Sequence, residues 1–528
     1  MSLHKKLNLE VNPYNFFISI VIIILFVFFG AAFPDRTNVV FGYIQEFIVD
    51  QFGWLYILSV SIFLIFVIYL FFSRFGKIKL GPDDSEPDYS YASWFTMLFS
   101  AGMGIGLVFF SVAEPMFHYL APPTIGGESL EAAREAMRLT FFHWGFHPWA
   151  IYIIVGMSLA YFHFRKGLPL SIRSAFYPLL GDKIYGWRGN TIDILAIFGT
   201  MFGVATSLGL GVMQVNAGLE YLFGVEVSTT IQILLIAGIT AIATISVVLG
   251  LDKGIRRLSN FNMSVAVGLI IFVFILGPTV YLLNATVENT GYYLQNLVQS
   301  SFWLGTFDGE AVDGWLAGWT LFYWGWWIAW SPFVGMFIAR ISRGRSIQEF
   351  VGGVLLVPTA FTFIWLTVFG NTALNMEILG DAGISGLDTE QMLFAMLDGL
   401  PLATITSIAA TLVIITFFVT SSDSGSLVID MLASGGNPNP PVGQRVFWAL
   451  SEGAVAAVLL LAGGLGGLQT AAITTGLPFT IILLLMCYSL YKGLSTEGTE
   501  RLVRRKTFKA KSKKPKESLD VDSGKQDE

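Results

Sequence analysis

Residues 315–345 carry an unusual density of indole rings. Six tryptophans fall within sixteen residues, namely Trp315, Trp319, Trp324, Trp326, Trp327 and Trp330. On a helix that rises about 1.5 Å per residue they extend over roughly 23 Å, which is deeper than an aromatic belt at one membrane interface. Ring faces attract a quaternary ammonium by about 0.5–2 kcal/mol per ring when water is excluded. The pattern predicts an aromatic cage for such a cation, with dense helix–helix packing as the alternative.

A second aromatic group lies in the stretch FFHWGFHPWAIY and contains Trp144, Trp149 and Tyr152. Trp149 and Tyr152 are three residues apart and therefore share a helix face, and Trp144 lies about one turn earlier. These rings either complete the cage or form a belt at the outer end of the helix. We expect His143 and His147 to be interfacial hydrogen-bonding residues rather than proton carriers.

Three glycines, Gly102, Gly104 and Gly106, alternate in the stretch SAGMGIGLVFF. Each costs roughly 1 kcal/mol relative to alanine inside a helix, and small-residue packing would use a spacing of four. The alternating spacing favours an unwound segment, which a membrane tolerates only where the backbone lines a cavity. Freed amides there attract a carboxylate, and freed carbonyls attract a cation.

Hydroxyl groups gather in the stretch TFFVTSSDSGS, where Thr420 and Ser421 are followed by Asp423. Each hydroxyl alone could simply bond back to its own helix. Together they predict a site for a hard cation such as sodium, because hard cations prefer oxygen ligands. We expect Asp423 to cap the helix or to pair with a cytoplasmic arginine.

These residues must be positioned by helices in a membrane. Hydrophobic residues make up 54% of the chain and charged residues 13%, against about 25% charged residues in soluble domains, and the mean hydropathy is +0.66. Twelve apolar stretches are long enough to cross a hydrocarbon core of about 30 Å. They lie near 14–33, 53–73, 91–113, 138–163, 192–222, 228–250, 262–284, 315–340, 350–371, 403–432, 446–467 and 470–492.

The sequence therefore predicts an all-α, polytopic membrane protein with twelve transmembrane helices. It contains no soluble catalytic domain and no nucleophile–base pair, so an enzyme is not expected, and no cofactor or nucleic acid is expected either. The single cysteine, Cys487, excludes an internal disulfide, and the five histidines show no zinc-type spacing.

Basic residues set the orientation in the cell membrane. Of the 31 lysines and arginines, only Arg36, Arg134 and Arg138 fall on stretches that we expect outside, so both termini are predicted to be cytoplasmic. Residues 114–137 are expected to form an outer loop with a short amphipathic helix, and 286–306 an outer interfacial helix. The tail after Lys492 is first basic, which suits adsorption to anionic lipid, and then acidic and expected to be disordered.

The glycine-interrupted third helix and the tryptophan-rich eighth helix lie five helices apart. Because an odd offset reverses orientation, the pattern predicts two inverted five-helix repeats, as in secondary transporters. The expected segments are a cytoplasmic stretch 1–13, two peripheral helices 14–90, a first repeat 91–284, an interfacial segment 285–314, a second repeat 315–492 and a charged tail 493–528.

The motifs AGMGIG, HWGFHPWAIY, WTLFYWGWWIAWSPFVGMFIARISRGR and TFFVTSSDSGS resemble those of the betaine/carnitine/choline transporters. The resemblance covers roughly residues 14–492 and implies a leucine-transporter-type fold, a homotrimer and sodium as the coupling ion. It implies that Trp144, Trp149, Tyr152 and Trp327 form a box around a trimethylammonium group. Trp324, Trp326 and Trp330 would line the box or the inward path, and the segment from Gly102 to Gly106 would face the carboxylate of the substrate.

The resemblance also implies sodium ligands. One ion would lie between the carbonyls of Ser100 and Met103 and the residues Phe417, Thr420 and Ser421. A second would involve Thr200 and Phe333, but Val204 stands where the family pattern has a hydroxyl. Because valine cannot be a ligand, a two-sodium stoichiometry is in question unless Thr206 or Ser207 compensates.

Met103 is typical of sodium-coupled betaine carriers, and Gly106 stands where choline-type relatives tend to carry an aspartate. Sodium-driven import of glycine betaine is therefore the leading hypothesis, ahead of ectoine, proline or dimethylsulfoniopropionate. A sodium-independent exchanger of carnitine- or choline-like cations is the alternative mechanism. An osmosensor that does not transport, suggested by the basic tail, is a third hypothesis.

Overall fold

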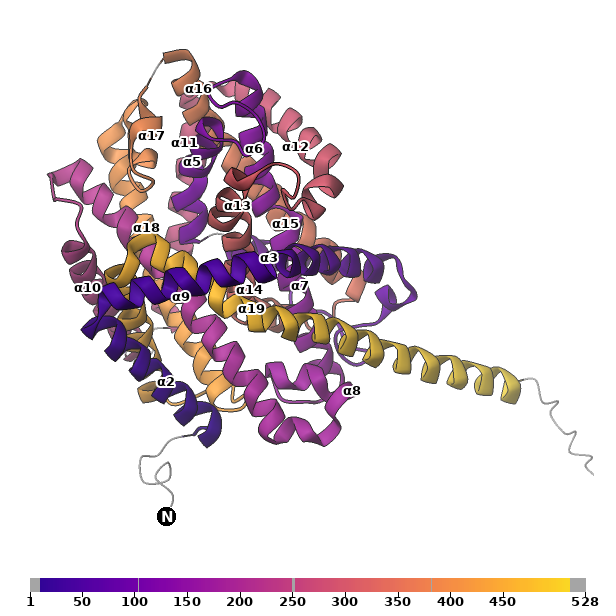
Figure 1. The fold of residues 1–528 in the computed structure, drawn as a ribbon. Coiled ribbons are helices and arrows are strands. Elements are labelled where there is room, and N and C mark those ends of the chain that lie inside the picture. Colours follow the sequence, from indigo (N-terminus) through magenta and orange to yellow (C-terminus); the bar gives the residue numbers. More distant parts are fainter. Residues whose placement is uncertain (1–9, 103, 249–251, 381, 513–528) are drawn as a thin grey trace, which may run out of the picture.

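The computed structural model describes residues 10–102, 104–248, 252–380 and 382–512, and these residues form helices joined by loops (Figure 1). Within them there is no β-strand, and one isolated antiparallel bridge joins Lys79 to Ser346. Nine helices of the described part are long and apolar enough to cross a membrane. The prediction of an all-helical polytopic membrane protein is confirmed at this level.

Among the described residues up to Leu276, nine helices are longer than ten residues. They are α2 (Pro13–Ala32), α3 (Pro34–Phe72), α4 (Tyr91–Gly102), α5 (Ile105–Leu120), α6 (Leu130–Trp144), α7 (Phe146–Ala160), α9 (Trp187–Phe223), α10 (Thr229–Val248) and α11 (Asp252–Leu276). Short helices lie between them, namely η1 (Arg74–Lys77), η2 (Tyr161–Arg165), η3 (Ile172–Phe176), α8 (Tyr177–Leu180) and η4 (Gly181–Tyr185).

The second half begins with α12 (Thr279–Phe302), which overlaps the end of the apolar stretch 262–284 and covers most of the segment 286–306. The helices that follow it are α13 (Glu310–Leu316), η5 (Ala317–Leu321), α14 (Phe322–Ile341), α15 (Ile347–Leu366), η6 (Thr367–Asn371), α16 (Thr372–Gly380), η7 (Ile384–Gly386), α17 (Met392–Asp398), α18 (Ala403–Ala433) and α19 (Val442–Ser512). The end of α19 projects away from the other helices in Figure 1.

Helix boundaries follow local chemistry. Ser346 and Glu349 form a reciprocal capping box at the start of α15, which satisfies two backbone N–H groups that would otherwise lack partners. Helix α9 ends at Gly224, whose φ of 69° is left-handed, a conformation that glycine adopts without strain. Inside each long helix the backbone satisfies itself, as a hydrocarbon environment requires.

The helices that carry the predicted site form the interior. Most residues of α5, α7 and α14 are buried, whereas α2 and α3 expose many isoleucine, valine and phenylalanine side chains. The assignment of 14–90 to two peripheral helices stays a prediction. Because the exposed side chains are apolar, their surface suits contact with lipid.

Two predictions about the helices need correction. Residues 114–120 belong to the buried part of α5, not to an outer loop, and the fourth apolar stretch is divided into α6 and α7 at Gly145. A Cβ on Gly145 would lie 2.6 Å from the carbonyl oxygen of Phe141 and 2.7 Å from the Tyr293 hydroxyl. Any side chain at position 145 would therefore clash with these two oxygen atoms, so only glycine fits at the break.

The last two apolar stretches belong to one long helix, α19, in which the backbone at Gly464 leaves the helical region with a φ of 55°. The apolar part of α19, Val442–Glu497, has 56 residues. As one straight helix it would measure about 84 Å, more than twice the thickness of a hydrocarbon core. The count of twelve transmembrane helices stays a prediction, and the acidic tail 513–528 lies outside the described residues.

Candidate functional site

The predicted break in the third apolar stretch is present. Helix α4 ends at Gly102 and α5 begins at Ile105, with Gly104 fully extended between them (φ −161°, ψ 176°). The first N–H groups of α5 have no partner within the helix, and they carry the positive end of its dipole. This end of α5 can therefore attract an anion.

A cavity lies at the start of α5, and all four residues of the predicted box line it. Its wall also includes Trp326, Trp330, Gly104, Ile105, Gly106, Leu107, Pro148, Ser207, Val334, Thr362 and Ser421. The structure thus brings the aromatic residues from three helices to the place where the backbone is unwound. Met103 lies outside the described residues, and Gly102 ends α4 next to this segment.

The rings of the box lie edge to face. The ring centroids of Trp144 and Trp327 are 4.8 Å apart at 73°, those of Trp149 and Tyr152 are 5.4 Å apart at 77°, and those of Tyr152 and Trp327 are 6.4 Å apart at 79°. Each of the four side chains is at least 93% buried. Rings at steep angles to one another present several faces to one space, as a cation cage requires.

Trp326 and Trp330 line the same cavity, beside the box. Trp326 stacks on Trp327 with centroids 4.7 Å apart, and its Nε1 donates a hydrogen bond to Ser207 Oγ. A Cβ on Gly106 would lie 2.2 Å from Trp326 Cη2. Glycine at this position therefore permits the close approach of α5 to the ring of Trp326.

The prediction that Trp324 lines the box or the path is not supported by its position. Trp324 is not among the residues that line the cavity, and its ring stacks on His147 and packs against Phe142. At about 100° per residue the side chain of Trp324 points roughly 160° away from that of Trp326, and it packs on α6 and α7 through Phe142 and His147.

A buried carboxylate fixes the ring of Trp144. Glu114 Oε2 accepts a hydrogen bond from Trp144 Nε1 at 2.7 Å and another from the hydroxyl of Tyr323. Its Oε1 lies 2.6 Å from His143 Nδ1 and 3.3 Å from His118 Nε2. All five side chains are at least 95% buried, so these polar groups satisfy one another inside the molecule.

The cluster of Glu114, His118 and His143 has the residue types of a metal site, and its ligand atoms lie within 4.8 Å of one another. However, the 2.6 Å between His143 Nδ1 and Glu114 Oε1 is a hydrogen-bond distance, and Trp144 and Tyr323 occupy the other carboxylate oxygen. The geometry indicates a hydrogen-bond network. The two histidines are therefore buried network members.

Glu114 is not among the site residues predicted from the sequence, because it lies in the segment 114–137 that was expected to be an outer loop. A signal was present, since an acid within an apolar stretch is expected to be functional. The other predicted interfacial histidine, His147, is also buried, and its Nε2 lies 2.9 Å from Ser301 Oγ.

Most of the predicted ligands of the first sodium line an adjoining cavity. Ser100, Phe417, Thr420 and Ser421 belong to its wall, and Ser421, Trp330 and Val334 line both this cavity and the box. The hydroxyl of Thr420 donates to the carbonyl of Thr416 at 3.0 Å, which leaves its oxygen lone pairs available to a cation.

The residues predicted for a second sodium are not brought together in the same way. Phe333 lines the adjoining cavity, but Thr200 does not, and the hydroxyl of Thr200 donates to the carbonyl of Ala196 at 2.8 Å. Thr206 bonds to the carbonyls of Phe202 and Leu468. Neither threonine faces the cavity that holds Phe333.

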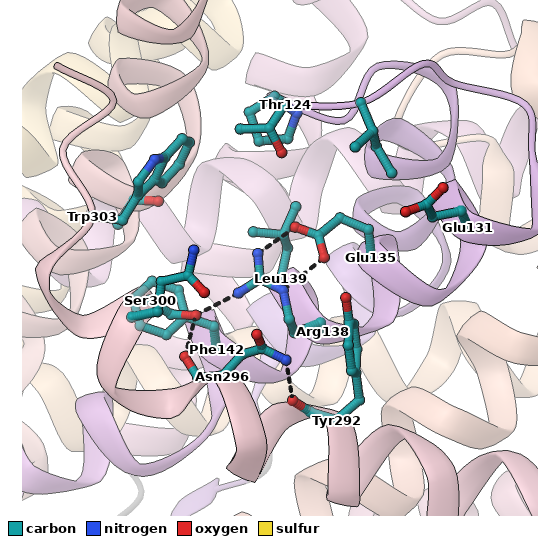
Figure 2. A pocket seen from close by; sticks show the side chains of 14 residues that line it. Thr124, Glu131, Glu135, Arg138, Leu139, Phe142, Tyr292, Asn296, Ser300 and Trp303 are labelled. Atoms are coloured by element: carbon teal, nitrogen blue, oxygen red, sulfur yellow. Dashed lines mark hydrogen bonds and ion pairs between the residues drawn. The ribbon is translucent and has the colours of Figure 1, made fainter. Parts of the chain in front are cut away.

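A third pocket, drawn in Figure 2, is lined mainly by side chains of α6 and α12. The Arg138 guanidinium points into it, pairs with Glu135 and donates to Ser300 Oγ. This pocket and the box share no lining residue. Thr320 lines the pocket, and its Oγ1 lies 3.0 Å from His143 Nε2. The network of Glu114, His143 and Thr320 thus separates the pocket from the box.

Comparison with known proteins identifies the class of this site. The model of the BCCT, betaine/carnitine/choline family transporters matches residues 15–499. A glycine betaine transporter of Acinetobacter baylyi is 50% identical over 93% of this chain and 74% of its own length. The glycine betaine transporter OpuD of Bacillus subtilis is 48% identical over 95% of this chain and 98% of its own. A glycine betaine/proline/choline transporter of Vibrio parahaemolyticus is 45% identical over 93% of this chain and 91% of its own.

The match spans both halves of the chain and every element that contributes to the cavity. Helices long and apolar enough to cross a membrane accompany it. The protein is a membrane transport protein rather than an enzyme, and it belongs to the betaine/carnitine/choline transporter family.

Proposed function

We propose that this protein is a sodium-coupled symporter that imports glycine betaine by alternating access. The observation that carries the proposal is the position of four ring faces beside the unwound start of α5. Glycine betaine has a trimethylammonium at one end and a carboxylate at the other. The rings suit the first group, and the free N–H groups of α5 suit the second.

The names of the relatives support the choice of substrate. Two of them are named as glycine betaine transporters, and the third name adds proline and choline. A zwitterion fits this site better than choline, because choline has a hydroxyl in place of the carboxylate and would leave the N–H groups of α5 without an anionic partner. Proline, ectoine and dimethylsulfoniopropionate rank below betaine.

Sodium coupling is supported by the cavity next to the box. The two cavities share Ser421, so an ion held by Thr420 and Ser421 would lie close to the substrate. Each sodium that crosses the membrane contributes about 2.3 kcal/mol per 100 mV. At about 1.4 kcal/mol per tenfold change, one ion supports roughly 40-fold accumulation of a net-neutral solute from voltage alone.

The remaining architecture belongs to the same proposal. We expect twelve transmembrane helices, with the inverted repeats 91–284 and 315–492 between the peripheral helices and the tail. Both termini would be cytoplasmic, the basic residues of the tail would contact anionic lipid, and the protein would assemble as a homotrimer. The cavity that holds Thr420 would then be the inward path, and the pocket beside Arg138 would face outside.

The proposal is tested by uptake of radiolabelled glycine betaine into proteoliposomes. With an inward sodium gradient and a negative interior we expect accumulation, and replacing external sodium with potassium should abolish it. Uptake that continues in potassium would instead indicate sodium-independent exchange. A panel of unlabelled competitors, including choline, proline and ectoine, ranks the substrates.

A further inference from the structure

A second buried acid lies in the helix bundle, away from the box. Glu452 on α19 has no exposed surface and lies ten residues inside the helix, which begins at Val442. Its Oε2 accepts a hydrogen bond from Ser422 Oγ at 2.9 Å, whereas Oε1 has no hydrogen-bond partner among the described residues. Ionisable residues at this depth are costly, and they often mark the path of an ion or a proton.

The free oxygen of Glu452 faces the contact between α18 and α9. A Cβ built on Gly425 would lie 2.8 Å from Glu452 Oε1 and 3.1 Å from Val204 Cγ2. The carboxyl oxygen and the valine methyl are therefore less than 6 Å apart. The resemblance described above implies a hydroxyl ligand for a second sodium at the position of Val204. The acid thus lies beside the point where that ligand is absent.

The surroundings of Glu452 suit a proton better than a metal ion. A sodium ion needs several oxygen ligands, but Val204 and Gly425 offer no side-chain oxygen, and Ser422 offers one. An ionised carboxylate with one hydrogen bond would be expensive in this place, whereas a protonated carboxyl group is neutral. The geometry therefore favours a group that gains and loses a proton.

The charged groups near Glu452 come from α18 and α19. Asp423, next to Ser422, forms an ion pair with Arg445 at 3.0 Å, and the Arg445 side chain is 16% exposed. Helix α10, which also packs on α18 and α19, contains no titratable residue, and α9 contains none between Asp193 and Glu220. Arg445 lies seven residues nearer the start of α19, so the Asp423–Arg445 pair gives Glu452 a polar route toward the loop 434–441.

We infer that Glu452 binds a proton, and that this proton, instead of a second sodium ion, is the second ion whose movement is coupled to betaine uptake. The carboxylate takes up a proton to become a neutral acid, and it releases the proton through the polar route formed by Asp423 and Arg445. Ser422 follows Thr420 and Ser421 directly, so a shift of this turn on sodium binding also changes the contact of Ser422 with Glu452. The inference rests on the proposed sodium-driven uptake of betaine.

The test uses the full-length protein in proteoliposomes that contain a pH-sensitive dye, with sodium equal on both sides and the voltage clamped at zero by potassium and valinomycin. An inward pH gradient should increase initial betaine uptake at least threefold, and added betaine should acidify the interior. The variant Glu452→Gln should lose both responses, whereas Glu452→Asp, which keeps a titratable carboxyl, should retain them. Glu390→Gln, an acid-to-amide change in the segment between α16 and α18, should behave as the wild type.

Several results would overturn the inference. Sodium-dependent uptake in the wild type without any response to the pH gradient would show that no proton is coupled, while leaving the proposed function intact. A response that persists in Glu452→Gln would assign the proton to another group. If Glu452→Gln does not reach the membrane, the wild type and Glu452→Asp still decide whether a proton moves. Absence of betaine uptake under every sodium condition would overturn the proposed function and this inference together.

Discussion

The indole N–H of Trp144 donates to the buried carboxylate of Glu114 at 2.7 Å, and this bond fixes one wall of the cavity at the start of α5. The same carboxylate accepts from Tyr323 and lies within hydrogen-bond distance of His143. Through His143 the contact continues to Thr320, which lines the third pocket. The ring of Trp144 is therefore connected, through Glu114, His143 and Thr320, to the pocket beside Arg138.

From this relationship we predict that Glu114→Gln weakens betaine recognition. Trp144 and Tyr323 both donate to Oε2, whereas Oε1 faces His143 and His118. Glutamine has one accepting oxygen, so one of these two sides of the network loses its acceptor, at a cost of about 1–3 kcal/mol for a buried unsatisfied group. The KM for betaine should rise about fivefold or more, and the emission of the buried tryptophans should shift. Glu390→Gln is the matched control, and an unchanged KM in Glu114→Gln would show that betaine recognition does not depend on the second accepting oxygen of Glu114.

We predict that Trp327→Ala lowers betaine affinity by about 1–2 kcal/mol, or roughly 5- to 30-fold, because one face of the box is removed. Titration calorimetry on the purified protein measures the change. Trp324→Phe is the control, because Trp324 packs against Phe142 and His147 rather than lining the cavity. Equal losses in both variants would mean that the effect comes from general packing.

Gly106→Ala should abolish most transport. The added Cβ would lie 2.2 Å from Trp326 Cη2, so either α5 or the stacked pair of Trp326 and Trp327 must move. We expect betaine uptake to fall at least tenfold. Gly238→Ala in α10 is the matched control, because a Cβ there meets nothing within 4 Å. Normal uptake by Gly106→Ala would contradict the proposed contact between α5 and the box.

The hydroxyls of Thr420 and Ser421 should set the sodium dependence. In Ser421→Ala we expect the sodium concentration for half-maximal uptake to rise at least fivefold, while betaine binding recovers at high sodium. Thr286→Ala on α12 is the control, because it removes a hydroxyl group that lines neither cavity. If sodium dependence is the same in both variants, Ser421 is not a ligand.

The sequence predicted those parts of the site that depend on composition and local spacing. Alternating Gly102, Gly104 and Gly106 correctly indicated a broken helix, and the position of Trp149 three residues before Tyr152 placed both rings on one face. Apolar stretches of about 20 residues likewise indicated an all-helical membrane protein, because the membrane dictates the length of a spanning helix.

Contacts between distant segments could not be predicted in this way. The sequence places Glu114 at the start of an expected outer loop, 114–137, yet α5 continues to Leu120. Its partners lie on α6 and α14, so only the fold reveals that the charge is matched. Composition groups Trp324 with Trp326 and Trp327, but its ring packs against Phe142 and His147 and does not line the cavity.

The most direct test of the cage replaces the charge of the ligand and keeps its shape. In 3,3-dimethylbutanoate a carbon atom takes the place of the betaine nitrogen, so the methyl groups and the carboxylate remain while the cationic centre is lost. If the ring faces hold a cation, this compound should bind at least tenfold more weakly than glycine betaine in calorimetric competition at saturating sodium. Equal affinity for the two compounds would contradict a cation cage formed by Trp144, Trp149, Tyr152 and Trp327.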